Sequence, residues 1–308
     1  MLSVRNLSIE FSRYDGNWRK KTIRPVRDLS LDIEAGEIVA VVGSSGSGKS
    51  LLAHAILGLL PPNARRQGEL IFNGDILDNR RSRKLRGKSI ALIPQSVAYL
   101  NPLSRVGSQV YRASRLSGKC CCTASKSRDE AFSRYQLKEM VKTMFPFQVS
   151  GGMARRVLTA TATAGDASLL IADEPTTGLD PMVAKQSLRH LRELADTGKG
   201  IMLITHDIDA AVDIADKVAV IYAGTTVEIA PSKSFRNADG LKHPYSQALW
   251  NALPQNGFYF LEGNQPLNDM SLEGCVFCER CPKRADNCQT QSQHLRKTGD
   301  NQVRCCHA

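Results

Sequence analysis

A glycine- and serine-rich stretch near the start of the chain has the residues of a phosphate-binding loop. It reads GSSGSGKS, from Gly43 to Ser50, and fits the pattern G-x-x-x-x-G-K-[ST]. Its glycines allow backbone N–H groups to surround phosphate oxygens, and the helix that follows adds a favourable dipole. We expect Lys49 to reach the β- and γ-phosphates of a nucleotide and the Ser50 hydroxyl to bind Mg²⁺.

The segments on either side of this loop support that interpretation. EIVAVV, before it, is a continuous apolar and β-branched run, which is typical of a strand buried on both faces. LLAHAILGLL, after it, has helical character, so a merely flexible Gly/Ser loop is the less favoured alternative. The residues expected to bind ATP here are Gly43, Ser44, Ser45, Gly46, Ser47, Gly48, Lys49, Ser50 and Leu51.

Two carboxylates end a second apolar strand. LLIADEP, from Leu169 to Pro175, places Asp173 where it can hold Mg²⁺ through water. Glu174, one residue later, can polarise the attacking water as a general base. Alone, the DEP sequence could also be a capped surface turn. The buried strand before it and the phosphate-binding loop upstream favour the catalytic interpretation.

Further short motifs accompany these two. VSGGM, from Val149 to Met153, contains a serine and two glycines whose N–H groups would lie at a helix start and face phosphate. Those three residues are Ser150, Gly151 and Gly152. TTGLD, LITHD and IPQ contain, in that order, Asp180, His206 and Gln95. Each motif has an ordinary structural reading by itself, but their order leaves little room for coincidence.

The order of these motifs resembles that of the ABC transporter ATPases, over about residues 1–235. In that family the VSGGM segment corresponds to a signature usually written LSGGQ, which completes the ATP site of an opposing subunit. Here Val149 replaces Leu and Met153 replaces Gln, and Met is common there in the peptide and nickel importer branch. The resemblance implies that Gln95 contacts Mg²⁺ and the attacking water, and that His206 contacts the γ-phosphate.

The resemblance also implies an aromatic side chain that stacks on the adenine ring. Phe11 aligns best with the family's position. Tyr14 is an alternative, because the SRYDGNWRKKT segment makes a long loop at this point. Ordinary packing is an equal alternative for either residue.

Strands that alternate with helices indicate a parallel sheet covered on both faces. With the resemblance, they predict an α/β fold, a P-loop NTPase (ABC ATPase) core with an antiparallel β subdomain and an inserted helical subdomain. A small Cys-rich C-terminal extension follows. We assign residues 1–235 to the ABC ATPase domain, with the helical subdomain at about 96–165, and residues 236–308 to the extension. The composition shifts after Lys233.

Six of the nine cysteines lie after residue 274. Four thiolates suit either tetrahedral zinc or a 4Fe–4S cluster. The spacing, together with HPYSQALWNALP at residues 243–254, resembles the C-terminal extension of the peptide and nickel importer branch, whose cysteines can hold an iron–sulfur cluster. That match implies the ligands Cys275, Cys281, Cys288 and Cys306, and leaves Cys278 and Cys305 as extra thiols. Zinc stays an alternative, and a structural role is favoured over electron transfer.

Three other cysteines stand together as Cys120, Cys121 and Cys122. They have no ligand spacing to a fourth group, and the segment GKCCCTASKSR that contains them is polar. We therefore expect a surface loop here and not a metal site.

The chain of 308 residues has a formal net charge of +11, part of it in the basic run from Arg80 to Lys88. Such a charge could meet nucleic acid, anionic lipid or an acidic partner. No aromatic residues interleave with the run, which disfavours a stacking surface. A soluble ABC ATPase that acts on nucleic acid or ribosomes would need tandem cassettes or a long coiled coil, and the sequence has neither. We expect a solvated basic face and no nucleic-acid partner.

The resemblance implies an ATPase subunit that powers an importer for peptides, nickel or metal–chelate complexes. Its partners would be a second, similar but non-identical ATPase subunit that forms a heterodimer with it, two transmembrane permease subunits and an extracytoplasmic substrate-binding protein. No membrane-length apolar run and no signal peptide are visible, so we expect a peripheral position at the cytoplasmic face of the cell membrane. A non-catalytic, redox-sensing ATP-binding module is a further alternative, which the intact Glu174 and His206 disfavour.

Overall fold

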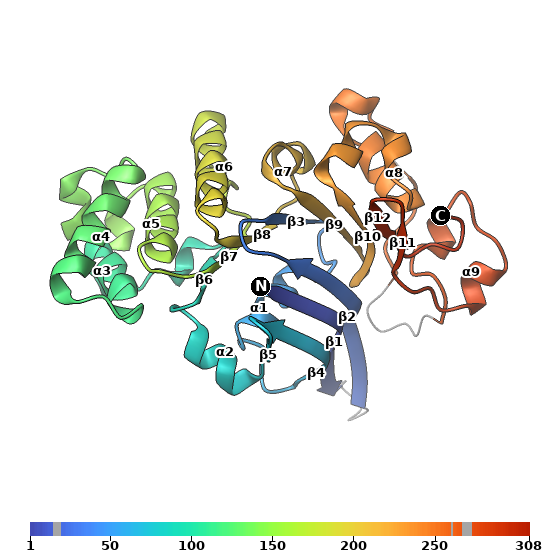
Figure 1. Cartoon of the computed structure of the whole chain (residues 1–308), viewed down its shortest axis with the longest axis horizontal. Coiled ribbons are helices and arrows are strands. Elements are labelled where there is room, and N and C mark those ends of the chain that lie inside the picture. Colours follow the sequence, from blue (N-terminus) through green and yellow to red (C-terminus); the bar gives the residue numbers. More distant parts are fainter. Residues whose placement is uncertain (15–19, 260, 267–272) are drawn as a thin grey trace. The chain divides into compact units, whose positions relative to one another are not determined.

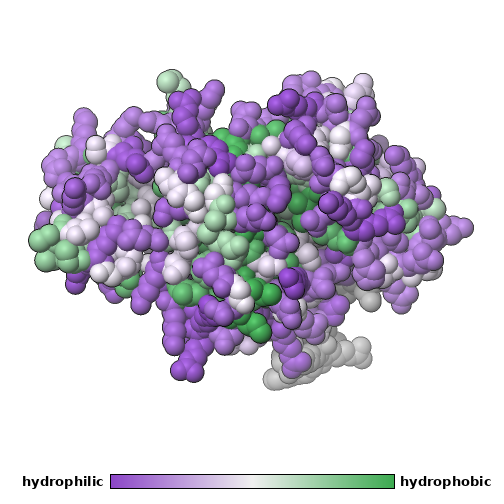
Figure 2. Space-filling view, in the orientation of Figure 1, coloured by the Kyte–Doolittle hydropathy of each residue, from purple (hydrophilic) through white to green (hydrophobic). Residues whose placement is uncertain are grey.

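The computed structural model describes residues 1–14, 20–259, 261–266 and 273–308. The chain divides into two compact units. Unit 1 contains Met1–Ile33, Ile38–Asp78 and Thr205–Ala308, and unit 2 contains Glu34–Glu37 and Asn79–Ile204. Within the described residues, no helix combines the length and apolar character needed to cross a bilayer. The face drawn in Figure 2 is covered mainly by hydrophilic residues.

Unit 1 contains an antiparallel sheet in the order β2-β1-β4-β5. Its strands are β1 (Leu2–Tyr14), β2 (Lys20–Ile33), β4 (Ala64–Phe72) and β5 (Asp75–Ile76). Val4 pairs with Leu31 on one side and with Leu70 on the other, and all three side chains are buried. This alternation of buried and exposed residues gives the sheet one apolar face. The predicted antiparallel β subdomain is therefore present.

A second set of strands in unit 1 has the order β11-β12-β10-β9-β3. The bounds are β3 (Ile38–Val42), β9 (Lys217–Tyr222), β10 (Thr225–Pro231), β11 (Arg296–Thr298) and β12 (Asn301–Val303). β3 and β9 run parallel, whereas β10 runs antiparallel to both β9 and β12. Every residue of β3 is buried, as expected for a central parallel strand.

The helices of unit 1 are short. They are α1 (Lys49–Ile56), α7 (Ile208–Ile214), α8 (Pro244–Asn251) and α9 (Asn287–Thr290), with 3₁₀ turns η4 (Ser232–Arg236), η5 (Ala238–Gly240), η6 (Pro254–Asn256) and η7 (Cys278–Arg280). In Figure 1 the extension, in orange and red, runs through α8 and α9 and returns to place β12 beside β10. The sequence did not predict these last two strands.

Unit 2 contains the parallel strands β6 (Ile90–Ile93), β7 (Leu169–Asp173) and β8 (Gly200–Ile204), with β7 between the other two. Its helices are α2 (Asn79–Leu85), α3 (Val106–Leu116), α4 (Cys121–Arg134), α5 (Gly151–Thr163) and α6 (Pro181–Asp196). Its 3₁₀ turns are η1 (Val97–Tyr99), η2 (Glu139–Thr143) and η3 (Pro146–Gln148). Parallel strands with covering helices are the arrangement that the alternating pattern predicts.

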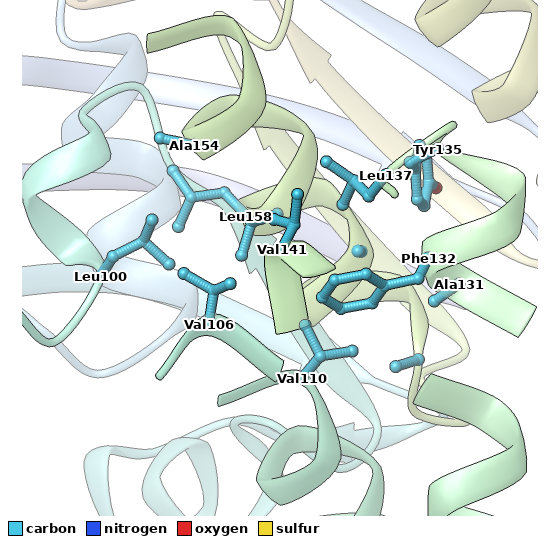
Figure 3. Close-up of a cluster of buried hydrophobic side chains, with 13 residues drawn as sticks. Leu100, Val106, Val110, Ala131, Phe132, Tyr135, Leu137, Val141, Ala154 and Leu158 are labelled. Atoms are coloured by element: carbon cyan, nitrogen blue, oxygen red, sulfur yellow. The ribbon is translucent and has the colours of Figure 1, made fainter. Parts of the chain in front are cut away.

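Helices α3, α4 and α5 share a small apolar core. Val106 and Val110 of α3 face Phe132 of α4, and Val141 and Leu158 complete the group (Figure 3). The mainly polar composition of the Cys120–Arg128 stretch concealed this packing. The prediction that Cys120–Cys122 lie at the surface is confirmed, since all three are exposed. The prediction of a loop was wrong, because Cys121 begins α4 and Cys120 is its N-cap. Ala124, Ala131 and Phe132 give α4 the buried stripe that a helix needs.

A buried carboxylate in β10 attaches the extension to unit 1. Glu228 has no exposed surface. It accepts hydrogen bonds from the backbone N–H groups of Lys242 and His243, at 2.8 and 3.0 Å, and from Asn301 Nδ2 at 2.8 Å. These donors come from both ends of the extension. The carboxylate therefore joins residues 242–243 and 301 to the same strand.

The Arg304 side chain makes a second attachment. It is 7% exposed. Its Nη1 donates to Asp28 Oδ2 at 2.5 Å and its Nε donates to the Thr226 carbonyl at 2.9 Å. The guanidinium thus connects the last residues of the chain to both sheets of unit 1.

Replacing Glu228 with alanine removes an acceptor from three donors in a site that water does not reach. We expect the Glu228→Ala variant to lose about 3 kcal/mol of unfolding free energy, because unpaired buried polar groups are costly. Chemical denaturation measures this loss. The matched control is Glu69→Ala, since Glu69 is exposed on β4. A loss no larger than that of the control would contradict the role assigned to Glu228.

Candidate functional site

The predicted phosphate-binding loop lies between β3 and α1 in unit 1. Its first glycine, Gly43, has a φ of 152°, and a Cβ there would lie 2.1 Å from the Ile221 carbonyl oxygen. Gly48 is the N-cap of α1 with a φ of 93°. A side chain at either position would strain the backbone and clash with neighbouring atoms. These glycines are therefore required for a curved backbone at the start of a helix, which is the geometry that binds phosphate.

The Lys49 ammonium lies within the curve of its own loop. Nζ donates to the carbonyl oxygens of Gly43 and Ser44, both at 2.8 Å, and lies 3.3 Å from Ser47 Oγ. This places a positive charge where the phosphates of a nucleotide would enter. Ser50, the expected Mg²⁺ ligand, is half-buried in the first turn of α1, and Leu51 follows it. The donors and charge of the loop fit a Mg²⁺–nucleotide.

The segment that carries His206 also belongs to unit 1. Thr205 N–H donates to the Val41 carbonyl of β3 at 3.2 Å, two residues before Gly43. His206 follows and is exposed, and Asp207 then caps α7 by accepting from Ala210 N–H at 3.0 Å. The histidine is thus held next to the strand that leads into the phosphate-binding loop.

Of the two aromatic candidates for stacking on adenine, only one can be described fully. Phe11 is half-buried in β1, where it pairs with Ile23 of β2 and Ala64 of β4. Tyr14 ends β1, but its side chain lies outside the described part of the structure. Stacking on adenine stays a prediction for both residues.

Unit 2 holds the two carboxylates at the end of β7. Asp173 is 6% exposed and Glu174 is 8% exposed. Glu174 has a φ of 49°, a left-handed conformation that is uncommon for a residue with a side chain. Its N–H donates to the Ile204 carbonyl at 2.9 Å, and its Oε2 accepts from Thr177 Oγ1 at 3.2 Å. Such a conformation is typical of a functional position that surrounding contacts fix.

Arg155 of α5 connects Glu174 to Gln95, a contact that the sequence did not reveal. Its Nη1 donates to the Glu174 carbonyl and its Nη2 to the Gln95 carbonyl, both at 2.8 Å. Burial lowers the pKa of Arg155, and the charge of Glu174 raises it in part. Gln95 itself is exposed after β6. One guanidinium therefore binds the backbone carbonyl groups of both residues and restrains their positions.

The signature residues lie at the exposed start of α5. Ser150 is the N-cap, and its Oγ accepts from Met153 N–H at 3.3 Å. Gly151 is exposed and has no atom within 4 Å of a would-be Cβ, and Gly152 meets only Leu179 at 3.9 Å. Asp180 caps α6 by accepting from Met182 N–H at 2.9 Å. The N-terminus of this 13-residue helix is thus presented at the surface of unit 2.

The cysteines of the extension surround one small cavity. The cavity is lined by all six of them, Cys275, Cys278, Cys281, Cys288, Cys305 and Cys306, together with His307. Cys288 Sγ lies 3.4 Å from Cys306 Sγ and 3.5 Å from His307 Nε2. These three ligand atoms lie within 4.8 Å of one another. The sequence had not singled out His307 as a ligand.

Burial keeps these thiols in their neutral form when no cation is bound. Burial raises the pKa of Cys275 to about 11, and burial with the neighbouring Cys288 raises the pKa of Cys306 to about 11. Burial also raises the pKa of Cys281. Without a cation these thiols stay protonated at neutral pH, whereas a bound metal deprotonates its thiol ligands. Soft sulfur donors of this kind fit zinc or iron.

Comparisons with known proteins cover both parts of the chain. Residues 26–177 match the model of the ABC transporter family, and residues 227–288 match that of the oligopeptide/dipeptide transporter C-terminal region. The dipeptide transport ATP-binding protein DppD of Bacillus subtilis is 36% identical over 94% of this chain and 88% of its own length. The oligopeptide transport ATP-binding protein OppD of Escherichia coli is 36% identical over 99% of this chain and 92% of its own length.

A solved structure agrees with this relationship. The dimeric structure of MJ0796, a bacterial ABC transporter cassette, is similar with a TM-score of 0.67 and 26% identity, over 75% of this chain and 99% of that one. The relatives described here are transport proteins and give no support to action on nucleic acid or ribosomes. With its phosphate-binding loop, its buried carboxylates and its signature helix, the chain is an ATP-hydrolysing cassette. It belongs to the ABC transporter family, among the ATP-binding proteins with an oligopeptide/dipeptide transporter C-terminal region.

Proposed function

We propose that this chain hydrolyses ATP to power the import of peptides. One observation carries the proposal: the likeness to peptide transport ATP-binding proteins runs through 94–99% of the chain, the C-terminal region included. Nickel and metal–chelate complexes are alternative cargoes. The cassette residues act on the nucleotide and not on the cargo, so the choice of cargo lies with the partners.

Each residue of the site has a separate role in hydrolysis. Lys49 neutralises charge on the β- and γ-phosphates, and Ser50 and Asp173 hold Mg²⁺, which would stabilise the charge that develops on the phosphates. Glu174 orients the attacking water and accepts its proton. The other assigned roles are Gln95 for the water and Mg²⁺, His206 for the γ-phosphate and Phe11 for the adenine.

Hydrolysis requires two cassettes in this proposal. Ser150, Gly151 and Gly152 are exposed or partly exposed at a helix start and would bind the γ-phosphate held by a second, similar ATPase subunit. Asp180 lies in the same exposed region. A single cassette should therefore bind ATP and turn it over very slowly.

Unit 2 exposes several large apolar side chains, which supports contact with membrane subunits. Four of them lie between β6 and α5 in the sequence and are called the apolar group here: Tyr99, Leu103, Met140 and Phe147, of which Leu103 is 88% exposed. Phe147 stacks on Phe145 at 5.6 Å, and the Arg105 guanidinium lies over the Phe145 ring at 6.0 Å. Large apolar side chains left exposed on a folded unit are typical of a protein interface. The proposed partners are two permease subunits and an extracytoplasmic substrate-binding protein, with the cassette peripheral at the cytoplasmic face of the membrane.

The cysteine cavity is proposed to hold a 4Fe–4S cluster, with zinc as the alternative. The proposed ligands are Cys275, Cys281, Cys288 and Cys306, all of which line the cavity. His307 offers a nitrogen that a Cys/His zinc site would use. In either case the metal would stabilise the extension, because metal binding contributes folding free energy directly.

The Glu174→Gln variant tests the hydrolytic role. The amide keeps the size of the side chain but accepts no proton, so we expect turnover of the assembled transporter to fall at least about 100-fold. ATP binding should persist, and ATP should stay trapped in the closed pair. The matched control is Glu130→Gln, on an exposed part of α4. Turnover of the Glu174 variant equal to that of the control would refute the mechanism.

Substitution in the apolar group tests the membrane partners. We expect Leu103→Asp to reduce co-purification with the permease subunits several-fold, because a charge would need to be desolvated at the interface. ATP binding by the isolated chain should be unchanged. Leu116→Asp, at the far end of α3, is the control. Full co-purification of the Leu103 variant would exclude this surface.

Metal analysis tests the cysteine site. We expect anaerobically purified protein to contain iron and sulfide, with a broad visible absorbance that Cys288→Ser abolishes. Zinc in place of iron would select the alternative. Cys122→Ser, an exposed thiol of α4, should leave the metal content unchanged. Protein that holds neither metal would rule out both versions of the site.

A further inference from the structure

We propose that the extension takes part in nucleotide binding, with Tyr245 and Gln265 as positioning residues of the phosphate-binding loop. Both residues lie in the C-terminal extension, and both hydrogen-bond to Ser44, the second residue of the loop. The proposal concerns the ATP site of the cassette and does not depend on the cargo or on the metal of the cysteine cavity.

The contacts hold Ser44 by its backbone and by its side chain. Ser44 N–H donates to Tyr245 Oη at 3.3 Å, across 201 residues of sequence. Ser44 Oγ donates to Gln265 Oε1 at 2.7 Å, across 221 residues. The remaining polar group of Ser44, its carbonyl, accepts from Lys49 Nζ at 2.8 Å. The extension thus fixes the same residue that positions the catalytic ammonium.

The Tyr245 hydroxyl has a fixed position. The residue is 6% exposed. Its ring packs against Tyr222 at 4.5 Å and Phe277 at 5.3 Å between centroids. Its N–H donates to His243 Nδ1 at 3.0 Å, and the His243 N–H in turn donates to the buried Glu228. A continuous set of buried contacts therefore leads from β10 to the loop.

Arg280, also in the extension, packs against this group of aromatic rings. Its guanidinium lies 5.9 Å from the Tyr222 ring centroid and 6.0 Å from that of Phe277. The same side chain donates to the carbonyl oxygens of Leu261 and Glu262, at 2.8 and 3.0 Å. Those two carbonyls precede Gln265 by a few residues. Arg280 therefore contacts both the aromatic group and the backbone of the segment that leads to Gln265.

A phosphate-binding loop works by presenting N–H groups that need no rearrangement when phosphate arrives. A loop held in advance loses less conformational entropy on binding, and this appears as affinity. Tyr245 and Gln265 supply such restraint from outside the loop. Losing one restraint should weaken ATP binding and leave the chemistry at bound ATP nearly unchanged.

The Tyr245→Phe variant removes the hydroxyl and keeps the ring. We expect the Kd of the full-length chain for Mg²⁺–AMP-PNP to rise about fivefold to tenfold, the equivalent of one lost hydrogen bond. The KM of the assembled transporter for ATP should rise in parallel, with kcat within about twofold of the wild type. The control is Tyr259→Phe, an exposed tyrosine of the same extension.

A double-mutant cycle separates positioning from simple attachment of the extension. If the Gln265 contact acts through Ser44 Oγ, then Gln265→Ala should weaken nucleotide binding in the wild type and have no further effect in Ser44→Ala. Two results would overturn the proposal. One is a lower melting temperature with an unchanged Kd in Tyr245→Phe and Gln265→Ala. The other is full additivity of the two substitutions in the cycle.

Discussion

The fold of unit 1 depends on how it accommodates one buried carboxylate. Glu228 lies in the middle of β10 with no exposed surface, and a charge in such a place is tolerated only when donors surround it. Two of its three donors are backbone N–H groups of residues 242–243, and the third is the Asn301 side chain at the start of the neighbouring strand β12. They come from the two ends of the extension, at residues 242–243 and 301. The extension is therefore part of the same folded body as the sheet, and its path is set by the need to satisfy this charge.

From that anchor the structure brings two kinds of chemistry close together. His243 begins a short path that ends at Ser44 of the phosphate-binding loop. Phe277, which packs on Tyr245, lies in sequence between Cys275 and Cys278 of the cysteine cavity. Tyr222, Tyr245 and Phe277 form one aromatic group. Phe277 lines the cysteine cavity and the Tyr245 hydroxyl accepts a hydrogen bond from Ser44, so this group contacts both sites.

Much of the nucleotide site could be predicted because its residues are local in sequence. Gly43–Ser50 needs only a strand before it and a helix after it, and Asp173 and Glu174 need only the apolar strand that they end. The contacts of Tyr245, Gln265, Arg155 and Arg304 could not be predicted. Each joins residues that are far apart in the chain, and none changes the local pattern of apolar and polar residues.

Two other features were hidden for a different reason. β11 and β12 have three residues each and are largely polar, so no alternation marks them as strands. Helix α4 begins in a polar and cysteine-rich stretch, and its apolar stripe becomes clear only with Ala131 and Phe132 near its end. For the tail, the spacing of cysteines suggested a shared site, but the inclusion of His307 depends on the turn that follows β12.

The pairing of β10 with β12 has a consequence for how the protein is made. β10 ends at Pro231, and its outer neighbour begins only at Asn301. During synthesis, β9 can pair with one edge of β10 at once, while the other edge stays open for the seconds needed to translate the intervening segment. An unpaired strand edge is a template for association with other chains. This edge of β10 is therefore covered only after the three residues of β12 have been made, and β11 then becomes the edge strand of the sheet.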